Sequence, residues 1–82
     1  MARNRRGKLE IIEDILKTAD DPDGANKTHL VYKSNLNFNR LEVLLPSLIE
    51  KGLIWDSGDG SYRITVKGRD LLKQLNFMKK ML

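Results

Sequence analysis

The feature that most restricts the fold of this chain is the absence of cysteine from a sequence of only 82 residues. Small proteins that bury little apolar surface are commonly held together by disulfides or by thiolate-bound metal, and neither is possible here. Packing must therefore hold the chain, within one domain or against a second subunit. A 40% share of hydrophobic residues is enough for one small core, and the length excludes most large enzyme folds.

The first part of the chain has the spacing of two helices. Residues 5–19 carry an apolar stripe, with Glu13 on the polar side. The apolar positions are Leu9, Ile12, Ile15, Leu16 and Ala19. Residues 29–34 fit a short second helix, for which Thr28 is the expected N-cap and in which Ser34 stays in solvent.

A tight break at residues 35–37 separates the second helix from a third over residues 38–51. Asn37 is a good N-cap for this helix, and Gly52 ends it. Its apolar positions are Leu41, Leu44, Leu45, Leu48 and Ile49. Pro46 lies inside the helix and has no N–H to donate, so we expect a kink or an early end there.

Two β-prone runs follow the third helix. Residues 53–55 and 62–64 flank the turn-forming residues 56–61, which predicts a two-stranded hairpin. Trp55 and Tyr62 are expected to flank each other across this hairpin and to pack there.

Thr65 can cap a last helix over residues 66–82. The chain is therefore expected to be mostly α with a small β-hairpin, in the order α-α-α-β-β-α. This is the order of a winged helix-turn-helix, whose second paired helix enters the DNA major groove while the hairpin lies over the backbone. We divide the chain into a basic N-terminal arm (1–8), a winged helix-turn-helix domain (9–65) and a C-terminal dimerisation helix (66–82).

Three stretches carry a family resemblance: KTHLVYKSNL at 27–36, LIEKGLI at 48–54 and YRITVKG at 62–68. They resemble the small archaeal winged helix-turn-helix DNA-binding proteins of the 10a type and related archaeal transcriptional regulators, over residues 9–75. The resemblance implies double-stranded DNA as a partner and a homodimer whose C-terminal helices pair as an antiparallel coiled coil. The candidate dimerisation residues are Leu71, Leu72, Leu75, Met78, Met81 and Leu82.

The side of the third helix opposite its leucines presents Asn39, Arg40 and Val43. An Asn can bond an adenine edge twice, an Arg can do so with guanine, and a Val can touch a thymine methyl group, so these residues form a candidate base-reading set. The alternative is that they are ordinary exposed helix residues. Glu42 counts against base reading, because a carboxylate there faces phosphates. Phe38 is expected to pack into the core or against the helix cap.

Phosphate contacts are expected from the N-terminal arm and from both ends of the second helix, where the resemblance would place them. The alternative for the helix ends is a solvated rim. The complete candidate DNA-binding set is Arg3, Arg5, Arg6, Lys27, Thr28, Lys33, Ser34, Asn37, Asn39, Arg40, Val43 and Arg63. At the hairpin, Asp56 and Asp59 repel phosphate and leave Arg63 as the one strand cation.

Nothing in the sequence forms a candidate catalytic or metal site. His29 is the only histidine, so neither a Ser/His/Asp set nor a His-based metal site can be completed within one chain. Asp20, Asp21 and Asp23 lack the one-three-five acid spacing of a calcium loop. We therefore expect no enzymatic activity, no cofactor and no metal, and we find no motif for a small-molecule ligand.

The formal net charge of +4 comes from the two ends of the chain. Residues 1–8 hold four cations and no acid, residues 9–66 hold six cations and ten acids, and residues 67–82 hold five cations and one acid. No apolar run is long enough to cross a membrane, so we expect a cytoplasmic, nucleoid-associated protein. The expected function is sequence-specific or architectural DNA binding, as a transcriptional regulator. The alternative is a winged-helix protein-protein interaction module that binds no DNA.

Overall fold

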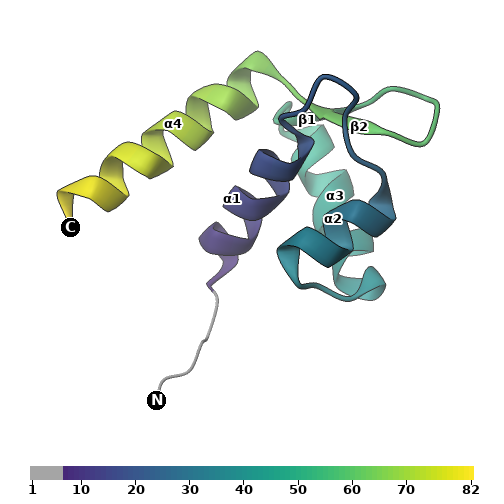
Figure 1. Ribbon diagram of the computed structural model, residues 1–82, viewed down its shortest axis with the longest axis horizontal. Helices are drawn as coiled ribbons and strands as arrows, with labels where there is room; N and C mark the ends of the chain where they lie inside the picture. The colour runs from purple at the N-terminus through teal and green to yellow at the C-terminus, as the bar shows by residue number, and fades with distance from the viewer. Residues whose placement is uncertain (1–6) are drawn as a thin grey trace.

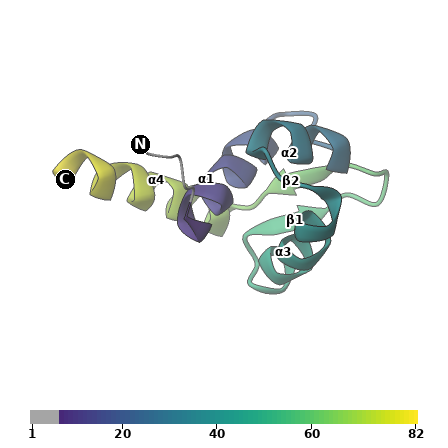
Figure 2. The same ribbon diagram turned by 90° about the horizontal axis from the view of Figure 1, so that it is seen from below.

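The computed structural model describes residues 7–82, and it confirms the expected order of elements (Figure 1). These elements are α1 (Lys8–Ala19), α2 (Lys27–Ser34), α3 (Phe38–Glu50), β1 (Ile54–Asp56), β2 (Tyr62–Ile64) and α4 (Val66–Met81). The helices α1, α2 and α3 cluster together with the hairpin at one end, while α4 extends away along the long axis (Figures 1 and 2). The chain is therefore a mostly helical fold with one small antiparallel hairpin.

Capping side chains set the helix boundaries, and two of the expected boundaries are wrong. Helix α1 begins at Lys8, because Gly7 is extended and its N–H donates to Glu10 Oε1 at 2.8 Å. Helix α2 begins before Thr28, because Asn26 is the N-cap and its Oδ1 accepts from the His29 N–H at 2.8 Å. A side-chain oxygen that accepts from the third residue of a helix satisfies one of the free N–H groups there.

The N-caps of α3 and α4 are the residues expected from the sequence, Asn37 and Thr65. The Asn37 side chain accepts from the Arg40 N–H at 2.8 Å, and Thr65 Oγ1 accepts from the Gly68 N–H at 2.9 Å. The early end expected at Pro46 is wrong, since α3 continues to Glu50. Pro46 is exposed, and the leucines on the opposite side of α3 are buried in the core, so packing stabilises the helix beyond the missing hydrogen bond.

The hairpin register differs from the expectation by one position. Strands β1 and β2 pair antiparallel with Trp55 opposite Arg63, and Asp56 opposite Tyr62. Successive residues of a strand point to opposite faces, so Trp55 and Tyr62 lie on different faces of the hairpin and do not flank each other. The Arg63 guanidinium lies over the Trp55 ring instead, 6.0 Å from its centroid.

A third segment joins the hairpin. The Ala25 N–H donates to the Tyr62 carbonyl at 2.9 Å, and the Tyr62 N–H donates to the Ala25 carbonyl at 2.8 Å. These two bonds tie the loop between α1 and α2 to β2. These bonds therefore help to fix the start of α2 relative to the hairpin.

The core lies between α1, α2, α3 and the hairpin, with a contribution from α4. Its buried apolar residues are Ile11, Ile15, Leu16, Ala19, Ala25, Leu30, Leu41, Leu44, Leu45, Leu48, Leu53, Ile54, Ile64 and Leu72.

Two expectations for α1 are wrong: Leu9 is 60% exposed, and Glu13 is buried, with 4% of its surface exposed. Glu13 lies where α4 approaches α1, and its carboxylate is 3.1 Å from Lys79 Nζ and 3.5 Å from Lys17 Nζ. These two cations offset the cost of removing the carboxylate from water.

Candidate nucleic-acid interface

The turn between α2 and α3 sets the angle at which the two helices meet. Asn35 takes the left-handed conformation, with φ 55 and ψ 46, which Asn tolerates better than most residues. Its N–H donates to the Tyr32 carbonyl, and the Leu36 N–H donates to the Val31 carbonyl, so the end of α2 is closed by backbone bonds. Helix α3 then begins directly after its N-cap, Asn37, and residues 38–40 of its first turn are exposed.

The candidate base-reading residues are all accessible. Asn39, Arg40 and Val43 are exposed on the first half of α3, and Val43 is 72% exposed although it is apolar. Residues near the N-terminus of the second paired helix are those that reach base edges in helix-turn-helix proteins. Asn39, Arg40 and Val43 therefore lie on the exposed side of α3.

An ion pair that the sequence analysis missed links α2 to α3. Lys27 Nζ lies 2.9 Å from Glu42 Oε2, and both side chains are partly exposed. The hydrogen bond with Glu42 raises the pKa of Lys27 above its usual value. The two residues are 15 positions apart, so no periodic signal in the sequence could have predicted the pair. Because Lys27 partly neutralises Glu42, this carboxylate is less repulsive to phosphate than the sequence alone implied.

The other candidate DNA-binding residues of α2, of the turn before α3 and of the N-terminal arm differ in accessibility. Thr28 and Lys33 are exposed and Lys27 is half-buried, so all three have polar atoms within reach of a ligand. Ser34 is fully buried and its Oγ has no hydrogen-bond partner among the described residues, so its expected exposure is wrong and it cannot contact DNA. Ser34 follows Leu30 by one helical turn and thus shares its buried side of α2. Asn37 is exposed, with Oδ1 engaged in the cap. Arg3, Arg5 and Arg6 lie outside the described residues.

Two exposed aromatic rings lie on the helix pair. Phe38 was expected in the core or against the helix cap, and because it is 49% exposed, the core position is wrong. It stands at the start of α3, one turn before the first buried leucine. Tyr32 on α2 is 80% exposed, and it is not among the residues expected at the interface. Its position in α2, two residues from buried Leu30, was the available signal that it points outward.

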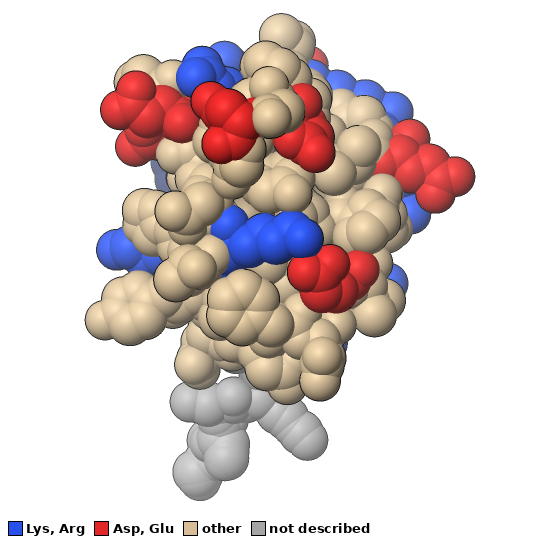
Figure 3. Space-filling view, turned by 90° about the vertical axis from the view of Figure 1, so that its right-hand side faces the viewer, with Lys and Arg blue, Asp and Glu red and all other residues tan. Residues whose placement is uncertain are grey.

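The acids at the hairpin tip form the turn. Asp56 Oδ1 accepts from the Gly58 N–H at 2.8 Å, and Asp59 Oδ1 accepts from both the Ser61 N–H and the Ser61 hydroxyl. The bonds from the Ser61 hydroxyl and N–H lower the pKa of Asp59 below its usual value. On the face drawn in Figure 3, acidic side chains gather at the end of the molecule where the hairpin lies. This tip is unsuited to deep insertion between phosphates.

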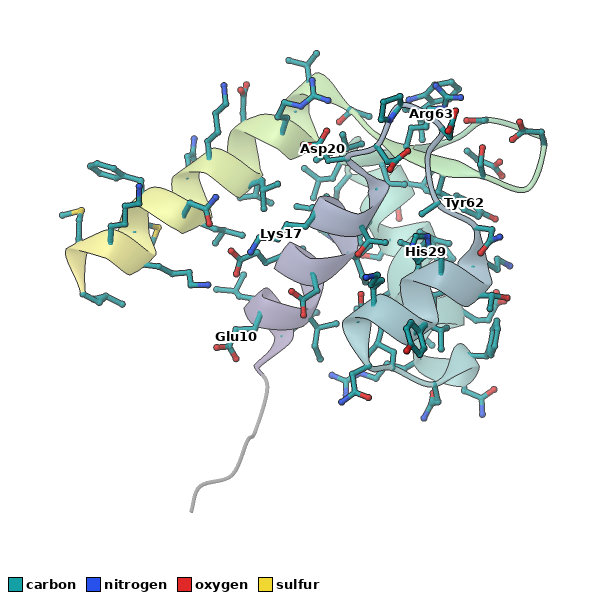
Figure 4. All side chains as sticks on the ribbon, viewed as in Figure 1. Glu10, Lys17, Asp20, His29, Tyr62 and Arg63 are labelled. Atoms are coloured by element: carbon teal, nitrogen blue, oxygen red, sulfur yellow. The ribbon has the colours of Figure 1, made fainter. Side chains whose placement is uncertain are left out.

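Arg63 is the middle residue of β2 and lies opposite Trp55. It lies beside the loop that carries Asp20 (Figure 4), and its Nε is buried without a hydrogen-bond partner among the described residues. The neighbouring Arg69 of α4 pairs with Asp20 at 2.9 Å.

His29 is exposed in the first turn of α2 (Figure 4). In residues 7–82, no group of three or more His, Cys, Asp or Glu side chains could hold a metal ion.

The candidate dimerisation residues on α4 differ in exposure. Leu72 is buried in the core of its own chain, so it cannot lie in an interface as expected. Leu71 and Leu75 are half-buried. Four apolar residues at the end of α4 are exposed, one of which, Phe77, was not expected there: Phe77, Met78, Met81 and Leu82. We call these four residues the α4 patch.

Two helices joined by a tight turn, followed by a two-stranded hairpin and a further helix, define the class of winged helix-turn-helix domains. A family model described as winged helix-turn-helix matches residues 5–82, and the chain belongs to this family. Domains of this family are typically non-enzymatic and DNA-binding. The comparison with curated proteins gave no match. Over the part of the chain that the structure describes, no helix is long and apolar enough to span a membrane.

Proposed function

We propose that this protein binds double-stranded DNA with α3 in the major groove and acts as a transcriptional regulator of the archaeal 10a-like kind. The observation that carries the proposal is the open first half of α3, where Asn39, Arg40 and Val43 are exposed. A polar and apolar mixture of this kind suits the edges of base pairs. Binding is sequence-specific where these side chains reach bases, and architectural where only phosphates are contacted.

In the proposal, residues of α2 and of the N-terminal arm contact phosphates on either side of α3. Lys27 and Thr28 stand at the start of α2, and Lys33 at its end. Lys33 and Arg40 form no ion pair with any residue in the described range 7–82, so their charges are available to phosphates. The N-terminal arm, residues 1–8, adds four cations without an acid. These contacts supply affinity, and the three residues on α3 supply sequence preference.

A homodimer through the C-terminal helix completes the proposal. The α4 patch exposes four large apolar side chains on one short segment. Contiguous apolar surface on a small protein marks an interaction site. A second copy placed on this patch would double the number of reading helices and set the distance between two half-sites.

A gel-shift titration against a random duplex at two salt concentrations tests the proposal. We expect binding at about 50 mM salt that weakens steeply by about 200 mM, because release of counterions from DNA drives the association. A protein that binds no duplex at the lower salt concentration would contradict the proposed function.

The second candidate function is a protein-protein interaction module. A groove beside α3 favours it: Glu42, Glu50 and Asp56 contribute carboxylates to its lining, and Lys27 contributes the one cation. Such a groove repels a phosphate backbone and suits a basic segment of another protein. Loss of all duplex binding at about 50 mM salt, in a protein that remains folded, is the outcome that this function predicts.

A further inference from the structure

Glu42, which pairs with Lys27 of α2, lies on α3 beside the candidate base-reading residues. Glu42 follows Asn39 by three residues and precedes Val43, so it borders the same side of α3. Its side chain is 54% exposed, and one oxygen, Oε2, accepts from Lys27 Nζ at 2.9 Å. The other oxygen, Oε1, makes no hydrogen bond with a residue of the described range. A held carboxylate with one free acceptor atom is thus presented where base edges would lie.

Only one base suits such an acceptor in the major groove. Cytosine presents the N4 amino donor there, whereas guanine presents two acceptors and thymine presents an acceptor and a methyl group. Adenine presents a donor, N6, beside an acceptor, N7, and that second atom repels a carboxylate. The acceptor chemistry of Glu42 therefore selects cytosine and opposes the other three bases.

The ion pair with Lys27 lowers the free-energy cost of bringing the Glu42 carboxylate close to DNA. A carboxylate taken out of water without a partner is strongly destabilising, and a nearby cation reduces that cost. Lys27 comes from α2 and stays within 2.9 Å of Glu42 without using Oε1. It also limits the number of positions that the Glu42 side chain can take, so the free oxygen is aimed before DNA arrives.

We propose that Glu42, held by Lys27, is a specificity-determining residue that accepts a hydrogen bond from the N4 amino group of a cytosine. This inference rests on the proposed DNA-binding function and extends it to one base of the target. In this role Glu42 attracts one base, whereas the sequence alone indicated only that it repels phosphates. Asn39, Arg40 and Val43 remain the readers of neighbouring positions.

Selection from a pool of randomised duplexes tests the role of Glu42. The full chain is compared with Glu42→Gln, with Glu42→Ala and with the control Glu50→Gln, which removes the same charge from the far end of α3. We expect the unmodified protein to enrich cytosine at one position by about fivefold or more, the lower end of what a good base contact contributes. Glu42→Gln should shift that position to adenine, because an amide matches both N6 and N7. Glu42→Ala should lose the preference without gaining a new one, and Glu50→Gln should leave it unchanged.

The outcomes separate this inference from the function on which it rests. An unmodified protein that binds no duplex overturns the proposed function. A protein that binds every duplex equally, or whose preferences are the same in Glu42→Gln, still binds DNA but overturns the role of Glu42. A shift of the same position in Glu50→Gln also overturns it, because the effect would then come from overall charge.

Discussion

Single polar side chains decide where the helices of this protein begin and which surfaces they present. Asn26 and Thr28 are both suitable N-caps by type, yet only the Asn26 side chain accepts the His29 N–H. Ser34 illustrates the opposite case, because a polar side chain is fully buried and its Oγ lacks a partner in the described part of the chain. The residue type alone does not distinguish these outcomes; the backbone around each residue does.

The Asn26 cap can be tested by substitution. Asn26→Ala should lower the free energy of unfolding by about 1 kcal/mol, because the first turn of α2 loses the acceptor for one N–H group. Urea denaturation followed by circular dichroism measures this change. The matched control is Thr28→Ala, which the same reasoning from sequence would have expected to be the damaging change. Thr28 is exposed inside the helix, so its loss should alter stability by less than about 0.5 kcal/mol. Equal effects of the two substitutions would contradict the assignment.

At the scale of elements, the placement of α4 depends on a buried carboxylate. Leu72 anchors the first half of this helix in the core, and Lys79 reaches Glu13 near its end. Lys17 points toward α4 from α1 (Figure 4) and contributes the second cation. The sequence predicted both helices from periodicity. It placed Glu13 in solvent, because the approach of α4 to that side of α1 is a tertiary contact between residues 66 positions apart.

Removal of Lys79 should loosen this contact. Lys79→Met leaves the buried Glu13 carboxylate with Lys17 alone, and we expect a loss of about 1 kcal/mol of stability, since Lys79 itself is largely exposed. Lys80→Met is the control, because it removes a neighbouring positive charge from the exposed side of α4. Chemical denaturation of both variants gives the comparison. A Lys79→Met protein as stable as Lys80→Met would show that the pair does not hold α4 in place.

At the scale of the whole molecule, charge and apolar surface are separated. Positive charge concentrates in the two ends of the sequence, whereas on the face drawn in Figure 3 acidic side chains lie near the hairpin. The α4 patch lies at the end of the helix that extends away from the other elements (Figures 1 and 2). The proposal assigns DNA contact to the arm with α2 and α3, and self-association to α4.

The role of the N-terminal arm predicts a change in salt dependence. A variant with Arg3, Arg5 and Arg6 replaced by Gln should bind all duplexes more weakly. Its plot of log affinity against log salt should flatten by about one unit for each arginine that contacts a phosphate. The matched control replaces Lys67, Lys73 and Lys80 by Gln and so removes the same charge from α4. An unchanged slope in the arm variant, or an equal change in the control, would rule out anchoring by the arm.

The α4 patch predicts the oligomeric state. We expect light scattering to give the mass of a dimer for the unmodified chain, and the mass of a monomer for a variant with Phe77→Ser and Met81→Ser. Both residues are exposed in the single chain, so circular dichroism should show the fold unchanged. Leu9→Ser, on α1, is a control for general loss of apolar surface. A monomeric unmodified protein would contradict dimerisation through α4.

The type and order of the elements, the Asn37 and Thr65 caps and the hairpin turn could be predicted from the sequence, because these features depend on neighbours within a few residues. The sequence also identified Asn39, Arg40 and Val43 as exposed, since helical periodicity assigns them a side. The hairpin register, the burial of Ser34 and the ion pair between Lys27 and Glu42 could be seen only in the folded protein. Those features depend on how separate elements pack, and packing places side chains together regardless of their distance along the chain.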